Sequence, residues 1–353
     1  ALNYTRASSF ERDSKGKLAA VRIEDQETGV QKEVKTGVVI NATGVFAQNL
    51  HPLPDKRFRV RPLRGSHLIF PGHWLALDRV LSFIHPRDSR PVFIFPWEGC
   101  LVLGTTDVDE NGSLGADPAI TRQEASYLME GLNFILPDLG IGPDNAIASL
   151  AGVRPVLSRG GKRASKESRE HLVWRDKGLV TVAGGKLTTF DLLAEDALKA
   201  AGPWLPRPKA PGGGRVSFPA TSERWSDFDR GDWLRLCGRY GQRADGVLKN
   251  VYQKKITGGT APVRVASTRT LWAELVYGAK FEQIRHLEDL LLRRVRIGLT
   301  LPKGGMEIMD RIRAQTQPVL GWDHERWEKE IRTYGHLWER AYSPSPWKGK
   351  NGG

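Results

Sequence analysis

A glycine pair followed by a lysine stands where an apolar segment passes into an amphipathic one, in the stretch VTVAGGKLTTFDLLAEDAL at residues 180–198. Gly184 and Gly185 let a flat ligand approach the backbone, and the N–H groups of a first helical turn could hold a negatively charged oxygen. Lys186 lies at the positive end of the expected helix dipole, which is unfavourable for a cation unless an anion is near. The stretch therefore predicts an anionic ligand, while a strand-to-helix turn with an incidental lysine remains the alternative.

Three further side chains could act on such a ligand. His67 follows a glycine and a serine in GSHLIF, and a histidine there could serve as a general base near neutral pH. Arg154 in GVRPVL and Arg169 before EHLVW are suited to bidentate recognition of phosphate. The alternatives are a hydrogen-bonded structural histidine and two surface arginines.

Small residues end another apolar run, VVINATG at residues 38–44. We interpret the run as a short, fully buried strand. Its end at Ala42, Thr43 and Gly44 would let the phosphate or adenine of a cofactor pack against the backbone, although a strand ending in a glycine turn looks the same. The two aspartates of GTTDVD, at residues 104–109, are interpreted as solvated turn carboxylates, and we predict no metal site.

The elements that would position these residues predict a mixed α/β (α+β) fold. Short strands separated by glycine turns predict a meander over 10–44 that ends in the strand VVIN, and PVFIFPWEGCLVLG and EHLVWRDKGLVTVAGG predict hairpins. TRQEASYLMEGLNFIL, at 121–136, predicts a helix with Thr121 as N-cap and Glu124 three residues later. A second helix would begin at an N-cap Thr188 and end at Gly202-Pro203.

A change of composition divides the chain. Residues 1–205 form the mixed region, 206–215 (PRPKAPGGGR) a linker, 216–345 a mainly helical domain and 346–353 a disordered tail. The formal net charge of +13 suits nucleic acid, an anionic membrane surface or phosphate-bearing small molecules. Two distant cysteines argue against a disulfide framework, and no apolar run is long enough to span a bilayer.

The motifs taken in order resemble the FAD-dependent, aerobic-type glycerol-3-phosphate dehydrogenase family over nearly the whole chain. The matching segments are VINATG, RGSHLIFP, LVLGTTDVD, SLAGVRPVL, SRE, VTVAGGKLTT and HLEDLLLRRVRIGL. The resemblance implies part of an FAD-binding domain, an antiparallel substrate-domain sheet and a C-terminal helical domain. It also implies oxidation of sn-glycerol 3-phosphate to dihydroxyacetone phosphate, with electrons passed to a membrane quinone.

Residue roles follow from the same resemblance. Ala42, Thr43 and Gly44, and the run from Gly184 and Gly185 to Leu187, Thr188 and Thr189, would contact the cofactor. Lys186 and Arg169 would bind the substrate phosphate, and His67 and Arg154 would flank the hydroxyl group, with His67 accepting the proton.

One family feature is missing from these residues. The family opens with a strand, a GxGxxG loop and a helix that hold the cofactor pyrophosphate, and this sequence contains none of them. We therefore expect a fragment of a longer protein or a truncated reading frame, which by itself would bind FAD weakly or not at all and would not turn over. Two alternatives stay open: an oxidase that uses oxygen, and a basic remnant that binds without catalysis. The resemblance implies a cytoplasmic chain, peripheral on the inner face of the membrane and not bound to nucleic acid, and it leaves a homodimer open.

Overall fold

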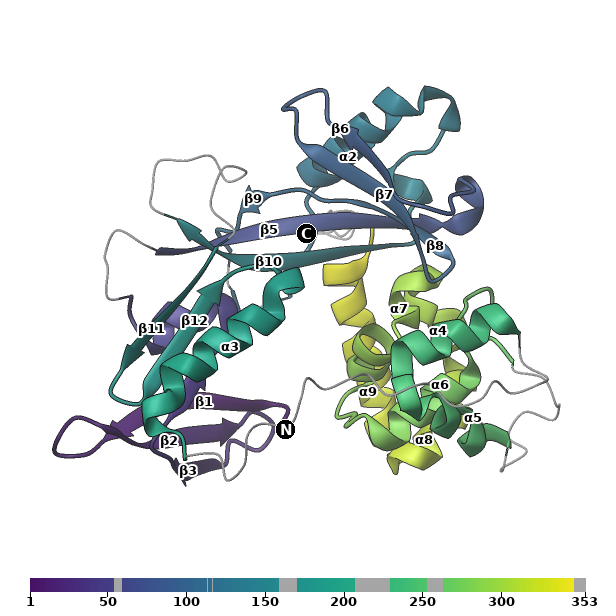
Figure 1. The fold of residues 1–353 in the computed structure, drawn as a ribbon. Helices are drawn as coiled ribbons and strands as arrows, with labels where there is room; N and C mark the ends of the chain where they lie inside the picture. Colours follow the sequence, from purple (N-terminus) through teal and green to yellow (C-terminus); the bar gives the residue numbers. More distant parts are fainter. Residues whose placement is uncertain are drawn as a thin grey trace, which may run out of the picture. The chain divides into compact units, whose positions relative to one another are not determined.

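The computed structural model describes residues 1–53, 59–112, 114–115, 117–158, 170–206, 229–252 and 263–345 (Figure 1). The chain divides into two compact units. The first contains Ala1–Gly65, Asp107–Ala116 and Gly152–Gly212, and the second contains Ser66–Thr106, Asp117–Ala151 and Gly213–Gly353. Two long strands, β5 (Arg59–Pro71) and β10 (Ala148–Ser158), contribute residues to both units.

The first unit opens with the predicted meander. Three strands pair in sequence order as an antiparallel sheet: β1 (Thr5–Arg12), β2 (Leu18–Asp25) and β3 (Gln31–Lys35). Leu18 and Ala20 on β2 are buried, whereas all of β3 is exposed. The meander is therefore confirmed for these three strands, but it is wrong for VVIN, which belongs to another sheet.

A second sheet of this unit carries the glycine pair. The predicted hairpin of β11 (His171–Asp176) and β12 (Leu179–Gly184) is confirmed, and β12 also pairs in parallel with β4 (Val39–Asn41). The interpretation of β4 as fully buried is wrong. Ile40 is 39% exposed and only Asn41 is buried, because β4 lies at the edge of this three-stranded sheet.

The helix after the glycine pair begins later than predicted. A 3-10 turn, η6 (Leu187–Thr189), comes first, and α3 spans Phe190–Ala201 and packs across β11 and β12 (Figure 1). Thr188 is inside the 3-10 turn and is not the N-cap, which is Thr189. The predicted end is confirmed, since Gly202 is the C-cap and begins a further 3-10 turn, η7 (Gly202–Trp204). A short α1 (Ala47–Leu50) follows β4.

The second unit is built on an antiparallel sheet. Its strand order is β10-β5-β8-β7-β6, with β9 (Val108–Asp109) also paired to β5 in the part of that strand that belongs to the first unit. The remaining strands are β6 (Leu81–Ile84), β7 (Pro91–Trp97) and β8 (Cys100–Gly104), and β7 and β8 form the predicted hairpin. Side chains alternate between the two faces of this sheet, so each face has its own apolar core.

The helix α2 (Arg122–Ile135) covers one face. Its capping box between Thr121 and Glu124 is as predicted. Leu128 and Leu132 pack there against Leu68 and Leu101 of the sheet. Thus a local capping signal and a helical apolar pattern together place this helix.

Helices of residues 229–345 cover the other face, where Ile69 and Val102 join their apolar core. They are α4 (Arg230–Tyr240), α5 (Ala244–Tyr252), α6 (Trp272–Phe281), α7 (Ile297–Thr300), α8 (Met309–Leu320) and α9 (His324–Leu337), with π-helical turns at Asp289–Arg294 and Trp338–Tyr342. The predicted mixed fold with a helical C-terminal region is confirmed. Of the predicted linker only Pro206 lies within the described residues, and the predicted tail lies outside them. Within the described ranges, no helix is long and apolar enough to cross a membrane.

Candidate active site

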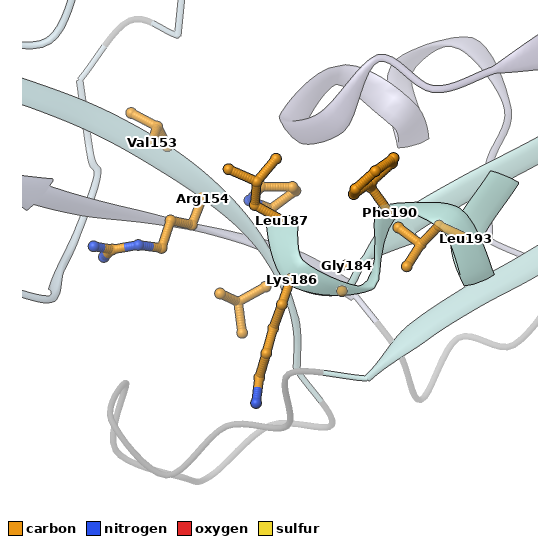
Figure 2. Close-up of a pocket in the computed structure, with 10 residues that line it drawn as sticks. Val153, Arg154, Gly184, Lys186, Leu187, Phe190 and Leu193 are labelled. Atoms are coloured by element: carbon orange, nitrogen blue, oxygen red, sulfur yellow. The ribbon is translucent and has the colours of Figure 1, made fainter. Parts of the chain in front are cut away.

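A groove of about 580 Å³ in the first unit brings together many of the predicted site residues (Figure 2). Gly184, Gly185 and Lys186 line it from the end of β12, and Arg154 lines it from β10. The remaining walls come from η6, from α3 and from the β10 residues on either side of Arg154. Strand, glycine turn and helix start thus converge on one cavity of the size that binds small ligands.

The glycine pair has a conformation that other residues adopt poorly. Gly184 has φ +80° and Gly185 has φ +84°, in the left-handed region. A Cβ atom at Gly184 would lie 2.5 Å from the carbonyl oxygen of Glu170, and one at Gly185 would lie 2.9 Å from Leu193. The turn therefore requires glycine for its backbone and for the space around it.

The wall beside this turn is apolar and open. Leu187 is 88% exposed and Phe190 is 59% exposed, although both are large hydrophobic residues. Exposed apolar side chains gathered at a groove are typical of a binding site. A flat aromatic ligand would remove them from water.

Arg154 is fixed at the groove by residues far away in the sequence. Its guanidinium lies over Gly65, where any Cβ atom would overlap it. Its Nη1 atom is 3.3 Å from Oδ1 of Asp107, whose side chain is only 3% exposed. The interpretation of the GTTDVD aspartates as solvated turn carboxylates is therefore wrong for Asp107. Its neighbour Asp109 forms a bidentate pair with Arg61 at 2.6 and 2.7 Å, and this hydrogen bonding lowers the pKa of Asp109.

Lys186 also lines an adjoining pocket of about 480 Å³, together with His171, Thr189 and Leu192. His171 Nε2 lies 2.9 Å from Oδ2 of Asp196, and this hydrogen bond lowers the pKa of Asp196. Sequence analysis did not single out this pair. Arg169 lies outside the described residues.

The predicted cofactor residues after β4 lie next to the groove. The Thr43 hydroxyl donates to Asn41 Oδ1 at 2.7 Å, and the Asn41 side-chain amide donates to the carbonyl of Ala47 at 3.0 Å. Gly44 has φ +62°, and a Cβ atom there would lie 3.8 Å from Pro155, which lines the groove. Ala42, Thr43 and Gly44 thus form a turn held by the buried Asn41 side chain.

His67 belongs to the second unit, whereas Arg154 and Lys186 belong to the first. It pairs with Gly104 across β5 and β8, and its ring lies where a Cβ atom of Gly104 would be. Only glycine on the neighbouring strand leaves room for this ring position.

A buried carboxylate supports β5, the strand that carries His67. Oε1 of Glu124 accepts hydrogen bonds from the hydroxyls of Ser66 at 2.8 Å and Thr106 at 2.7 Å, and Oε2 accepts from the backbone and hydroxyl of Thr121. Sequence analysis recognised Glu124 only as a capping residue. In the described part of the chain, no three His, Cys, Asp or Glu side chains are grouped to hold a metal ion.

Comparison with known proteins agrees with this architecture. The model of the family "FAD dependent oxidoreductase" matches residues 1–195, and "C-terminal domain of alpha-glycerophosphate oxidase" matches residues 210–327. Glycerol-3-phosphate dehydrogenase 2 of Mycobacterium tuberculosis is 31% identical over 334 residues, covering 90% of this chain and 56% of that protein. Aerobic glycerol-3-phosphate dehydrogenase of Staphylococcus aureus is 26% identical over 318 residues, covering 83% of this chain and 56% of that protein.

The chain thus spans a little over half the length of these curated relatives. Among solved structures, glycerol-3-phosphate dehydrogenase from Bacillus halodurans complexed with FAD has the same fold, with a TM-score of 0.74 and 23% identity over 96% of this chain and 69% of that one. Since the first family match takes in more than half of the residues, including the whole groove, the chain belongs to the FAD-dependent oxidoreductase family.

Proposed function

We propose that this chain supplies the flavin-facing groove and the substrate-binding arginine and lysine of an enzyme that oxidises sn-glycerol 3-phosphate to dihydroxyacetone phosphate. The observation that supports the proposal is the meeting of Arg154, Lys186 and the Gly184-Gly185 turn in one groove. Because the chain spans 56% of its curated relatives, the activity is proposed for the enzyme of which the chain is a part.

The groove fits the ring system of FAD. Its glycine turn admits a ligand against the backbone, and its exposed Leu187 and Phe190 offer an apolar face to a planar ring. The amide groups of the helix start at η6 would point donors at a negatively charged ring oxygen. When bound, FAD supplies the capacity to accept a hydride from the substrate carbon.

The chain's own residues would hold the substrate. Lys186 and Arg169 would bind its phosphate, and Arg154 would orient its hydroxyl, since the Asp107 carboxylate keeps the guanidinium in place. We propose His67 as the acceptor of the hydroxyl proton. The hydrogen bond from the Ser66 hydroxyl to the Glu124 carboxylate anchors β5, the strand that carries that histidine.

The final electron acceptor that we propose is a membrane quinone. Because a quinone lies in the membrane, we also propose that the enzyme binds an anionic membrane surface at the inner face of the cytoplasmic membrane. The formal net charge of +13 favours such binding. The match of residues 210–327 to the C-terminal domain of alpha-glycerophosphate oxidase supports a second candidate, an oxidase that uses oxygen. Peroxide release under air distinguishes the two candidates.

The test is anaerobic titration of the FAD-loaded enzyme with glycerol 3-phosphate, followed by the visible absorbance of the flavin. We expect the flavin band to bleach. Lys186→Met should raise the substrate concentration for half-bleaching by about 10-fold to 100-fold, because a hydrogen bond to a charged group contributes roughly 1.5–3 kcal/mol.

Lys199→Met is the matched control, because Lys199 stands on the exposed side of α3 with its side chain 70% exposed. It should titrate like the unmodified enzyme. Bound FAD that glycerol 3-phosphate does not bleach would contradict the proposed reaction and favour the non-catalytic remnant. Equal titration by both variants would contradict the role of Lys186.

A further inference from the structure

A second groove of the first unit, of about 520 Å³, lies where two hairpin turns meet the end of α3. Lys15 and Lys17 line it from the turn between β1 and β2, and Arg175 and Lys177 line it from the end of β11 and the turn that follows. Trp204 lines it from η7. None of these residues lines the groove of the glycine pair.

Backbone contacts fix the two turns against each other. The N–H of Leu18 donates to the carbonyl of Lys177 at 2.9 Å, and the N–H of Val39 donates to the carbonyl of Gly178 at 2.9 Å. A Cβ atom at Gly178 would lie 2.5 Å from the carbonyl oxygen of Gly37. The groove is therefore a preformed feature of packed backbone segments.

The groove carries a local excess of positive charge. Lys15, Lys17, Arg175 and Lys177 are all exposed cations. The carboxylate in the groove, Asp176, is paired with Arg12 at the rim, with 2.8 Å between Nη2 and Oδ2. Lys177 Nζ donates to the carbonyl of Lys15 at 3.3 Å, and Arg175 Nη1 donates to the carbonyl of Ala200 at 3.5 Å. These partners are uncharged, so they do not offset the positive charge of the groove.

The nearby Asp13 holds the turn that carries two of these cations. Its Oδ1 atom accepts the backbone N–H groups of Lys15 and Lys17, each at 2.9 Å, so its carboxylate holds the turn that presents both lysines. Counting Arg12 and Asp13 at the rim, the groove has five cations and two carboxylates, a net charge of +3. An anion would be attracted from solution to this point.

The turn at Lys177 and the ring of Trp204 complete the lining of the groove. Lys177 has φ +43°, a left-handed conformation that Asn or Gly adopts more readily in a two-residue hairpin turn. Trp204 is half-buried beside it, with Cζ of Arg175 at 6.0 Å from the Trp204 ring centroid. The groove therefore joins several cations to an aromatic surface.

We propose that this groove binds a phosphate group. Its ligand is a phosphate mono- or diester whose oxygens meet Lys15, Lys17 and Lys177 and whose less polar part lies against Trp204. An anionic phospholipid headgroup and a soluble phosphate compound share this chemistry. The proposal does not rest on the oxidation reaction proposed above, because it involves neither Arg154 nor Lys186; a lipid ligand would give the proposed membrane attachment a defined contact site.

The test compares two variants with the same change of charge. Lys15→Gln/Lys177→Asn removes two cations from the groove, and asparagine at 177 keeps the left-handed turn. Lys32→Gln/Lys35→Gln removes two exposed cations from β3, outside the groove. Each protein is sedimented with vesicles of phosphatidylcholine containing phosphatidic acid, and separately titrated with inorganic pyrophosphate by calorimetry.

We expect the groove variant to bind about 30-fold more weakly and the β3 variant less than about threefold more weakly, since each lysine near an anionic surface contributes about 1 kcal/mol. Weakening on vesicles alone identifies a lipid headgroup, and weakening toward pyrophosphate identifies a soluble phosphate ligand. Equal weakening by both variants, or no binding of either probe by the unmodified protein, would overturn the proposal.

Discussion

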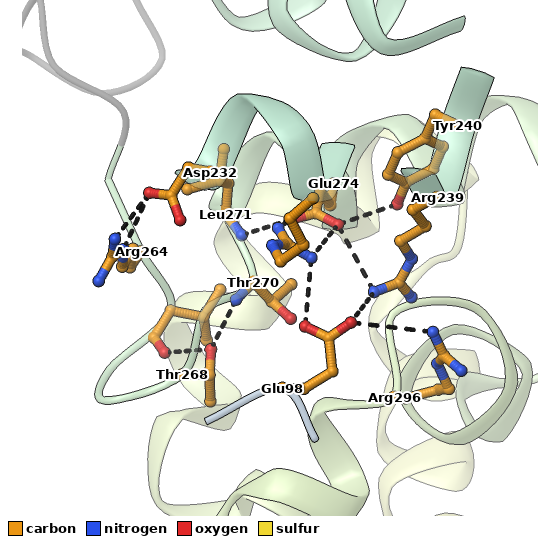
Figure 3. Close-up of polar contacts among 12 residues, drawn as sticks. Glu98, Asp232, Arg239, Tyr240, Arg264, Thr268, Thr270, Leu271, Glu274 and Arg296 are labelled. Carbon is orange, nitrogen blue, oxygen red and sulfur yellow. Dashed lines mark hydrogen bonds and ion pairs between the residues drawn. The ribbon is translucent and has the colours of Figure 1, made fainter. Parts of the chain in front are cut away.

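Glu274 on α6 is fully buried among arginines, and its charge can be removed with little change of shape (Figure 3). It pairs with Arg235, lies 3.6 Å from Arg239, and accepts a hydrogen bond from the hydroxyl of Tyr240 at 3.2 Å. Burial alone would lower the pKa of Arg235, but its acidic neighbours, Glu274 foremost and Glu98 after it, together raise that pKa. Glu274→Gln should therefore leave buried positive charge without its main counter-charge.

The expected loss of unfolding free energy follows from the contacts that remain in the Glu274→Gln variant. Glutamine can still accept the N–H of Leu271, which donates to Glu274 Oε1 at 2.8 Å, so the variant tests charge more than hydrogen bonding. Among the described ion pairs, Glu98 at the β7–β8 turn is the carboxylate that would then face the arginines, at 3.3 Å from Arg235, 3.6 Å from Arg239 and 4.0 Å from Arg296. Breaking a buried ion pair on one side destabilises by about 3–5 kcal/mol.

Urea unfolding of the second unit, followed by circular dichroism, measures this loss. Glu98→Gln should cost less, about 1–2 kcal/mol, because its side chain is 14% exposed and its contacts are longer. Glu325→Gln, in the exposed first turn of α9, is the control and should change stability by less than about 1 kcal/mol. If Glu274→Gln unfolds at the same urea concentration as Glu325→Gln, the reasoning is refuted.

Three further outcomes are expected. Gly184→Ala should destabilise the first unit by at least about 1–2 kcal/mol in thermal unfolding, because its φ is +80° and its Cβ atom would lie 2.5 Å from a carbonyl oxygen, whereas Gly152→Ala, on β10 with open space around its Cβ position, should be nearly neutral. Burial lowers the pKa of His51 below 6.5, so the free energy of unfolding should fall as pH drops below about 6.5; His51→Gln should flatten that slope, and an unchanged slope would contradict it. Glu124→Gln should cost about 1.5–3 kcal/mol, since an amide nitrogen cannot accept the hydrogen bonds that Glu124 receives from hydroxyl and N–H groups, and calorimetry measures the loss.

Local signals in the sequence predicted elements well. The Thr121–Glu124 capping box needs only residues three apart, and it places the start of α2 correctly. At Thr188 the same kind of signal was misleading, because a 3-10 turn comes between the lysine and the α-helix. The apolar residues of β4 predicted a buried strand. Whether a strand is central or at an edge depends on pairing with strands far away in the sequence, here β12.

The site depended still more on distant contacts. The spacing of Asp107 and Asp109 is that of alternate strand residues, yet Asp107 turns to Arg154, 47 residues later, and Asp109 to Arg61, 48 residues earlier. Neither the composition nor the local spacing of the sequence predicts these two ion pairs. The glycine pair and Lys186 were predictable, because the unusual residue types stand together at one strand-to-helix junction.

The sheet of the second unit depends on residues made much later. The Cys100 thiol on β8 donates to the carbonyl of Thr300, 200 residues further along the chain, and Ile69 and Val102 share a core with α6–α9. At about 5–20 residues per second, a ribosome needs roughly 10–40 s to make that interval. During synthesis one apolar face of the sheet therefore stays exposed to solvent until its helices have been made. We expect the nascent chain to need a chaperone until the last third of the sequence has left the ribosome.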